Sequence, residues 1–81
     1  MNPGEAWSQF RLAQLSMSGG GVTQDPARAL RLYQDAAAGG EPMAQRALGD
    51  LYANGTLVER DPGEAARWYR AAALQAGAAR R

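Results

Sequence analysis

Two aspartates, Asp25 and Asp61, are the carboxylates best placed to do chemistry in this sequence. A carboxylate can act as a general acid or base, or bind a hard cation. Each aspartate is followed by proline, however, and Asp before Pro is the pattern of a helix N-cap with proline at the first helical position. Glu64, three residues after Asp61, completes the pattern as a reciprocal capping-box partner. We therefore assign both aspartates to helix capping.

Other residue types that carry chemistry are scarce. The 81 residues include no histidine and no cysteine, which removes the commonest general base, the thiolate nucleophile and the usual zinc ligands. The glycine run at 19–21 lacks the preceding strand and the following Lys-Ser/Thr of a phosphate-binding loop, and no serine has a histidine or lysine to activate it. The sequence predicts a protein that is not an enzyme, with no catalytic residue, metal site, cofactor or small-molecule substrate.

The charge balance also limits the classes of partner. The formal net charge is +1 and every basic residue is arginine, whereas a small nucleic-acid-binding domain usually has a strong basic excess on one face. No apolar run approaches the roughly 20 residues that cross a bilayer, and the N-terminal residues lack the pattern of a signal peptide. We expect neither a nucleic-acid nor a membrane partner. We expect a cytoplasmic protein, or a periplasmic one if the chain is a processed fragment; its Ala-, Gly- and Arg-rich composition suggests a bacterial source.

Cap and glycine signals divide the chain into four helices. Proline follows a capping residue at each expected start, and glycine or Asn-Gly stands near each expected end. The expected helices span residues 3–18, 26–38, 42–54 and 62–76. The loops between them are short, which makes successive helices antiparallel neighbours, and no strand pattern is present. The predicted class is all-α.

The stretch 44–73 has a weaker copy of itself 36 positions earlier, where Asp61-Pro62 falls on Asp25-Pro26. A period of this length with helix-turn-helix content is typical of an α-solenoid. We predict one domain, residues 1–81, made of repeat one (about 5–40), repeat two (about 41–77) and a basic tail (78–81). Helical spacing predicts the buried faces of the third and fourth helices, and Gly49 marks a close helix crossing. These faces are Ala44, Ala47, Leu48, Leu51 and Tyr52, and Ala65, Ala66, Tyr69, Ala72 and Ala73.

These residues resemble the Sel-one-like repeats, short α/α-hairpin relatives of the tetratricopeptide repeats. Repeat two carries the family pattern at Ala44, Leu48-Gly49, Tyr52, Gly55, Val58, Asp61, Ala65, Trp68-Tyr69 and Ala72-Ala73. Repeat one departs from it at Ser8, Ala13, Ser16 and Leu32, and repeat two departs at Leu57, where the family has a second loop glycine, and at Glu64. The resemblance implies a right-handed α/α solenoid of two helix-turn-helix repeats and an adaptor role in protein–protein complexes.

The first helix carries more apolar residues than the expected core face needs. Leu12 and Leu15 fall on that face, which leaves Trp7, Phe10 and Met17 roughly opposite. Aromatic residues and methionine are enriched at protein interfaces. We therefore predict that a protein partner docks on the inner face of the first helix of each repeat. The candidate partner-binding residues are Trp7, Phe10, Gln14, Met17, Met43, Arg46 and Asp50.

Three alternatives to this docking face stay open at the level of sequence. The first helix can rotate so that Trp7 and Phe10 pack onto their own hairpin. The two ends of so short a solenoid can pair with each other, giving a homo-oligomer. The chain can also be a small subunit or inhibitor held permanently in a larger complex.

Overall fold

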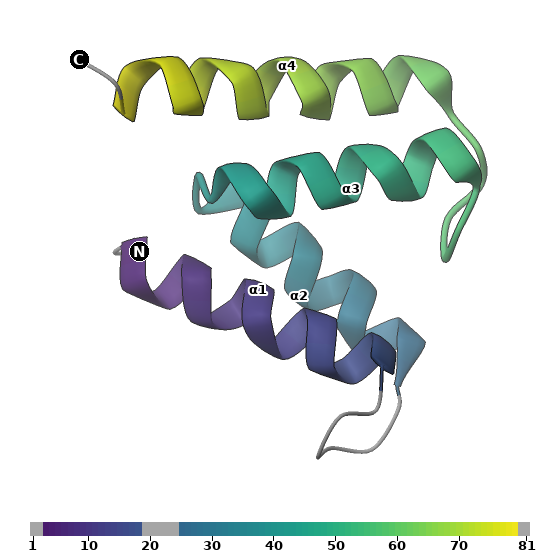
Figure 1. Cartoon of the computed structure of the whole chain (residues 1–81). Helices are drawn as coiled ribbons and strands as arrows, with labels where there is room; N and C mark the ends of the chain where they lie inside the picture. Colours follow the sequence, from purple (N-terminus) through teal and green to yellow (C-terminus); the bar gives the residue numbers. More distant parts are fainter. Residues whose placement is uncertain (1–2, 19–24, 80–81) are drawn as a thin grey trace.

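The chain folds into four α-helices in the computed structural model, which describes residues 3–18 and 25–79 (Figure 1). The helices are α1 (Pro3–Ser18), α2 (Pro26–Ala38), α3 (Pro42–Asn54) and α4 (Pro62–Ala79). The predicted all-α class is confirmed, and only the end of α4 differs, since it runs through Gly77 to Ala79. None of the described helices is long and apolar enough to span a bilayer. Asn2, which the sequence predicts as the cap of the first helix, lies outside the described residues, as do the glycine run at 19–21 and tail residues 80–81.

The two Asp-Pro pairs cap helices as predicted. The Oδ1 atom of Asp25 accepts a hydrogen bond from the Arg28 amide at 3.1 Å. The Oδ1 atom of Asp61 accepts one from the Glu64 amide, also at 3.1 Å. Each bond satisfies one of the N–H groups that have no partner inside the first helical turn.

The reciprocal half of the predicted capping box at Asp61 is wrong. The Asp61 amide instead donates to the carbonyl of Tyr52 at 2.9 Å, across the loop from α3. The Glu64 carboxylate pairs with the Arg67 guanidinium at 2.6 Å. Because the loop bond already satisfies the Asp61 amide, the Glu64 side chain is left to an ion pair one helical turn along.

Each helix packs on its neighbours in the sequence. α1 lies against α2, α2 against α3, and α3 against α4, with only slight contact between α1 and α3. Figure 1 shows α3 and α4 side by side, with the α1–α2 hairpin crossing below them. Of the other described helices α4 contacts α3 alone, so one long side of α4 has no helix on it.

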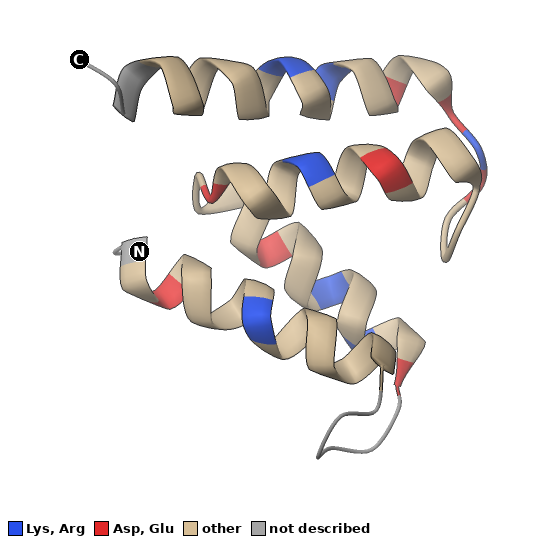
Figure 2. Cartoon of the chain, in the orientation of Figure 1, with Lys and Arg blue, Asp and Glu red and all other residues tan. Residues whose placement is uncertain are grey.

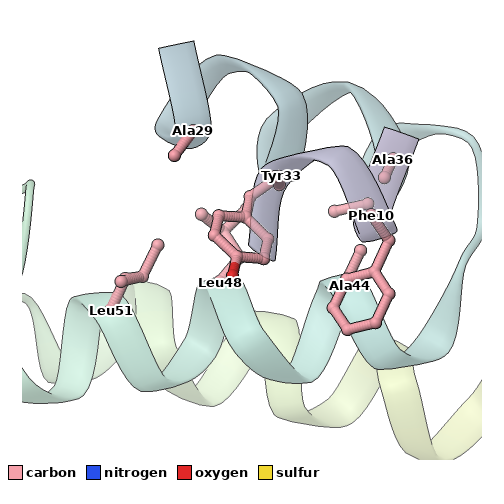
Figure 3. Close-up of a cluster of buried hydrophobic side chains, with 9 residues drawn as sticks. Phe10, Ala29, Tyr33, Ala36, Ala44, Leu48 and Leu51 are labelled. Carbon is pink, nitrogen blue, oxygen red and sulfur yellow. The ribbon is translucent and has the colours of Figure 1, made fainter. Parts of the chain in front are cut away.

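The core lies where the two repeats meet. The side chains of Ala44, Leu48 and Leu51 project from α3 toward α2 and Phe10 of α1 (Figure 3). They are buried among residues of repeat one that are themselves nearly inaccessible to solvent. These are Phe10, Ala13, Ala29, Tyr33, Ala36 and Ala37. Alanine at so many of these positions lets the backbones of α2 and α3 approach closely, while the leucines and rings fill the remaining space.

The α3–α4 crossing is close because residue 49 is glycine. A Cβ atom at Gly49 would lie 2.8 Å from Cε1 of Tyr69 and 3.3 Å from the carbonyl oxygen of Ala65. Neither distance leaves room for a methyl group without a shift of the ring or of α4. The predicted close crossing at Gly49 is therefore confirmed.

The loop between α3 and α4 holds one residue in an unfavourable backbone conformation. Leu57 has φ of 67°, in the left-handed region that L-residues with a side chain avoid. Gly55, the C-cap of α3, has a similar φ of 69° at no steric cost. The Leu57 side chain packs against the core, so its burial offsets the strain of a turn for which the resembled family uses glycine.

We predict that Gly49→Ala destabilises the fold by about 1–3 kcal/mol, the usual cost of overpacking a close contact. Urea unfolding followed by circular dichroism measures the change. Gly77→Ala in α4 is the matched control, because a Cβ there meets no atom within 4 Å. Alanine at 77 should stabilise the helix by up to about 1 kcal/mol. Equal effects of the two substitutions would contradict the close crossing.

Candidate functional site

Helix α1 is rotated relative to the orientation that the sequence predicted. Its buried residues are Ala6, Phe10, Ala13 and Ser16. Leu12 and Leu15, expected in the core, are only half-buried. The Phe10 ring instead packs beside Tyr33 of α2, with ring centroids 6.0 Å apart.

The physical reason lies in the neighbours that each helix has. Leu48 and Leu51, the equivalents of Leu12 and Leu15 in repeat two, are buried because α3 packs on the preceding hairpin. Leu12 and Leu15 have no equivalent helix against them among the described residues, so they stay half-buried. The expectation that Phe10 lies opposite the core is wrong, because the only hairpin partner of α1 is α2 and Phe10 faces it.

The other candidate residues of α1 divide between the core and the surface. Trp7 keeps 44% of its surface exposed and packs at a tilt against Phe10, with ring centroids 5.6 Å apart. Met17 is half-buried against the core. Gln14 is half-buried and accepts a hydrogen bond from Nη1 of Arg11 at 2.8 Å. The structure thus leaves Trp7 as the exposed member of the predicted apolar face of α1.

The candidate residues of α3 line a groove. Met43 and Arg46 are exposed and form one wall, and the C-terminal half of α4 forms the other. The groove has a volume of about 510 Å³. We call it the α3/α4 groove, lined by Pro42, Met43, Arg46, Tyr69, Ala72, Ala73 and Ala76. Its walls combine alanine methyl groups and a methionine with one guanidinium and one phenol.

The α4 wall was missed at the level of sequence. Tyr69, Ala72 and Ala73 share the spacing of a buried face, but Tyr69 is 38% exposed and Ala73 is exposed. Ala66, also expected in the core, is exposed, while Ala65 is buried as predicted. The pattern correctly marks a face suited to burial. It does not say whether another helix lies on that face.

Asp50, the third candidate partner-binding residue on α3, holds the hydroxyl group of Tyr69 at the edge of the groove. The Tyr69 hydroxyl donates to Oδ1 of Asp50 at 2.5 Å. This hydrogen bond, with smaller contributions from burial and from the Asp50 charge, raises the pKa of Tyr69, while Arg46 nearby opposes the rise. The hydrogen bond thus favours the protonated phenol, and the Tyr69 ring lies directly over Gly49 of α3.

The described surface carries no concentrated charge. Figure 2 shows acidic and basic positions interspersed on the helices. A second hollow, of about 350 Å³ on the outer side of α2, likewise mixes Asp25 and Asp35 with Arg28 and Arg31. No group of three histidine, cysteine, aspartate or glutamate side chains that could hold a metal occurs in the described part of the chain.

We predict that Phe10→Ala destabilises the fold by about 3–5 kcal/mol, because it removes a ring from the centre of the core. Trp7→Ala should cost less than about 1.5 kcal/mol, since the ring is half exposed and loses mainly its contact with Phe10. Urea unfolding compares the two, with Phe10→Leu as a milder variant that keeps the protein folded. Equal costs for Trp7→Ala and Phe10→Ala would contradict this placement of α1.

A second prediction concerns the pKa of Tyr69. Removing the carboxylate by Asp50→Ala should lower the pKa of Tyr69 toward its usual value, because the hydrogen bond to Asp50 is the main cause of the rise. Ultraviolet titration of tyrosinate absorbance reports the shift, and Tyr69→Phe identifies the step that belongs to Tyr69. The pKa of Tyr69 is higher in the folded than in the unfolded protein. The hydrogen bond to Asp50 therefore stabilises the fold at pH values below the unfolded pKa near 10, and this stabilisation is lost as the pH rises through the folded pKa. An unchanged titration in Asp50→Ala would contradict the assignment.

Comparison with known proteins places the chain among repeat proteins. A family model described as the Sel1 repeat matches residues 8–41 and, a second time, residues 42–76. The crystal structure of a Sel1 repeat protein from Oxalobacter formigenes is 38% identical, with a TM-score of 0.85, over 88% of this chain and 53% of that one. The crystal structure of c5321, a protective antigen of uropathogenic Escherichia coli strains with an SLR fold, is 40% identical, with a TM-score of 0.80, over 89% of this chain and 15% of that one. No curated protein gives a match.

This chain therefore spans about half of one of these solved relatives and a smaller part of the other. The family model matches both of the repeats that the sequence predicted, and both solved structures share the fold of this chain over the part that is matched. The chain belongs to the Sel1 repeat family, whose members generally serve as modules for protein–protein interaction.

Proposed function

We propose that this chain is a non-catalytic adaptor that docks a helical segment of a partner protein in the α3/α4 groove. The observation that carries the proposal is the exposure of the groove. Met43 keeps 53% of its surface exposed and Tyr69 38%, side by side with exposed alanines. An apolar groove between two helices suits the apolar face of an amphipathic helix.

This docking surface includes some of the partner-binding residues that the sequence predicted, but not all of them. Met43, Arg46 and Asp50 remain in it, because they lie in the groove or hold its edge. Phe10 and Met17 leave it, because they pack into the core of repeat one. The α4 residues Tyr69, Ala72 and Ala73 enter it, because they form the second wall of the groove.

The chemistry of the groove limits the partner. Small side chains on α4 allow close approach of a helix backbone, and Met43 can adjust its rotamer to an irregular apolar surface. Arg46 offers a charged donor at the rim, suited to a carboxylate on the partner. We therefore propose a partner helix with an apolar stripe and an acidic residue beside it.

Affinity capture from cells that produce the protein, followed by mass spectrometry, tests the groove. We expect Arg46→Glu to reduce recovery of the bound partner by about tenfold, because it reverses the charge at the rim. Arg70→Glu is the matched control, since Arg70 is exposed on α4 and does not line the groove. Both variants should unfold at the same urea concentration as the unmodified protein. Equal recovery by Arg46→Glu and the unmodified protein would refute the docking site.

A further inference from the structure

The α3/α4 groove is the second copy of a surface that is already occupied in repeat one. Tyr33, Ala36 and Ala37 on α2 are 8%, 0% and 2% exposed because α3 lies on them. We call these three the trailing face of repeat one. Thirty-six residues later the trailing face of repeat two repeats them identically as Tyr69, Ala72 and Ala73. There it lines an open groove.

The surface that fits a trailing face also occurs twice. Gln45, Leu48 and Leu51 of α3 pack on repeat one and are 4%, 1% and 8% exposed. We call them the leading face of repeat two. Their equivalents on α1 are again identical, Gln9, Leu12 and Leu15. All three are half-buried rather than buried, and they lie on a different side of α1 from Ala6, Phe10 and Ala13, which pack within the hairpin.

A buried hydrogen bond fixes the register of the occupied pair. Nε2 of Gln45 donates to the carbonyl oxygen of Ala37 at the end of α2, at 3.0 Å. The equivalent residues of the two unoccupied faces are Gln9 and Ala73. The Oε1 atoms of Gln9 and Gln45 are both buried, and neither has a hydrogen-bond partner among the described residues. Gln9 thus shares with Gln45 a buried Oε1 without a described partner. Ala73 corresponds to Ala37, but α4 continues past it to Ala79 whereas α2 ends at Ala38.

We propose that the α3/α4 groove receives α1 of a second copy of this chain. The two copies associate head to tail, in the register in which repeat two packs on repeat one, with Gln9, Leu12 and Leu15 of one copy lying on Tyr69, Ala72 and Ala73 of the next. This inference rests on the proposed function, because it names the partner of the same groove. The leading face of α1 and the trailing face of α4 are then two halves of one interface.

Two differences make this contact weaker than the one inside the chain. Arg46 stands in the groove where repeat one has Phe10, and Ser8 stands on α1 where repeat two has Ala44. Both replace apolar groups at the centre of the junction with polar ones, and polar groups cost free energy to desolvate. The association is therefore reversible and depends on concentration. Because the two faces differ, it adds further copies rather than closing at a dimer.

Four single variants of the full chain test the proposal. Ser8→Arg blocks the leading face, since Ser8 is exposed and its equivalent, Ala44, is fully buried at the junction. Ala73→Arg blocks the trailing face. The matched controls are Ser18→Arg, an exposed serine at the other end of α1, and Leu74→Arg, a 69% exposed neighbour of Ala73 outside the groove. Circular dichroism confirms that each variant is folded.

Sedimentation velocity over a concentration series gives the readout. We expect the average mass of the unmodified protein to rise with concentration past that of a dimer, and both controls to behave in the same way. Ser8→Arg and Ala73→Arg alone should each weaken association by tenfold or more. An equimolar mixture of the two should form a one-to-one dimer and nothing larger, because the mixture retains one intact leading face and one intact trailing face.

A protein that stays monomeric throughout the series overturns the proposal, as does a mass that stops at a dimer or a mixture that does not pair. Failure of the proposed function gives a different result. If the unmodified protein is monomeric but Ala73→Arg and Arg46→Glu both lose a different captured protein, the groove is a docking site and the second copy is not its partner. If the unmodified protein is monomeric and neither Ala73→Arg nor Arg46→Glu loses a captured protein, both the docking site in the groove and its proposed occupant are refuted.

Discussion

The packing of α3 onto α2 is the contact on which the rest of the structure depends. It buries Leu48 and Leu51 against Ala29, Tyr33 and Ala36, and it is nearly the whole connection between the two hairpins. Alanine at the α2 positions sets the distance between the helices, and leucine fills what alanine leaves open. Because the hairpins pack on each other mainly through α2 and α3, the outer sides of α1 and α4 have no described helix against them.

The elements of the fold could be predicted from the sequence because their signals are local. A capping aspartate, the proline after it and a terminating glycine act within one helical turn, and the helix starts at Pro26 and Pro62 follow from them. The face of α1 could not be predicted in this way. Phe10 and Leu12 are both apolar, and which of them is buried depends on the helices that lie alongside. The α4 wall of the groove was missed for the same reason.

The candidate site combines a face that repeats unchanged in both repeats with a few residues that differ between them. At the position of Phe10, repeat two has Arg46, and the side chain that fills the core in one repeat is replaced by one that stays in solvent. The phenol of Tyr33 is buried, which raises its pKa, whereas that of Tyr69 is held by Asp50 at the surface. Tyr69, Ala72 and Ala73 are accessible because no described helix lies on that side of α4, and the substitutions change only the polar groups that border the groove.

The arrangement in which each helix touches mainly its neighbours in the sequence also has a consequence for folding. Contacts of short sequence separation cost little loop-closure entropy, so helical chains of this kind fold rapidly. Stability then varies along the chain rather than being uniform. α2 and α3, each with helices on two sides, should exchange their amide hydrogens most slowly, and the far half of α4, which has only α3 as a helix neighbour, should open first. The groove is built partly on that half, so its two walls separate and close again far more often than the molecule unfolds.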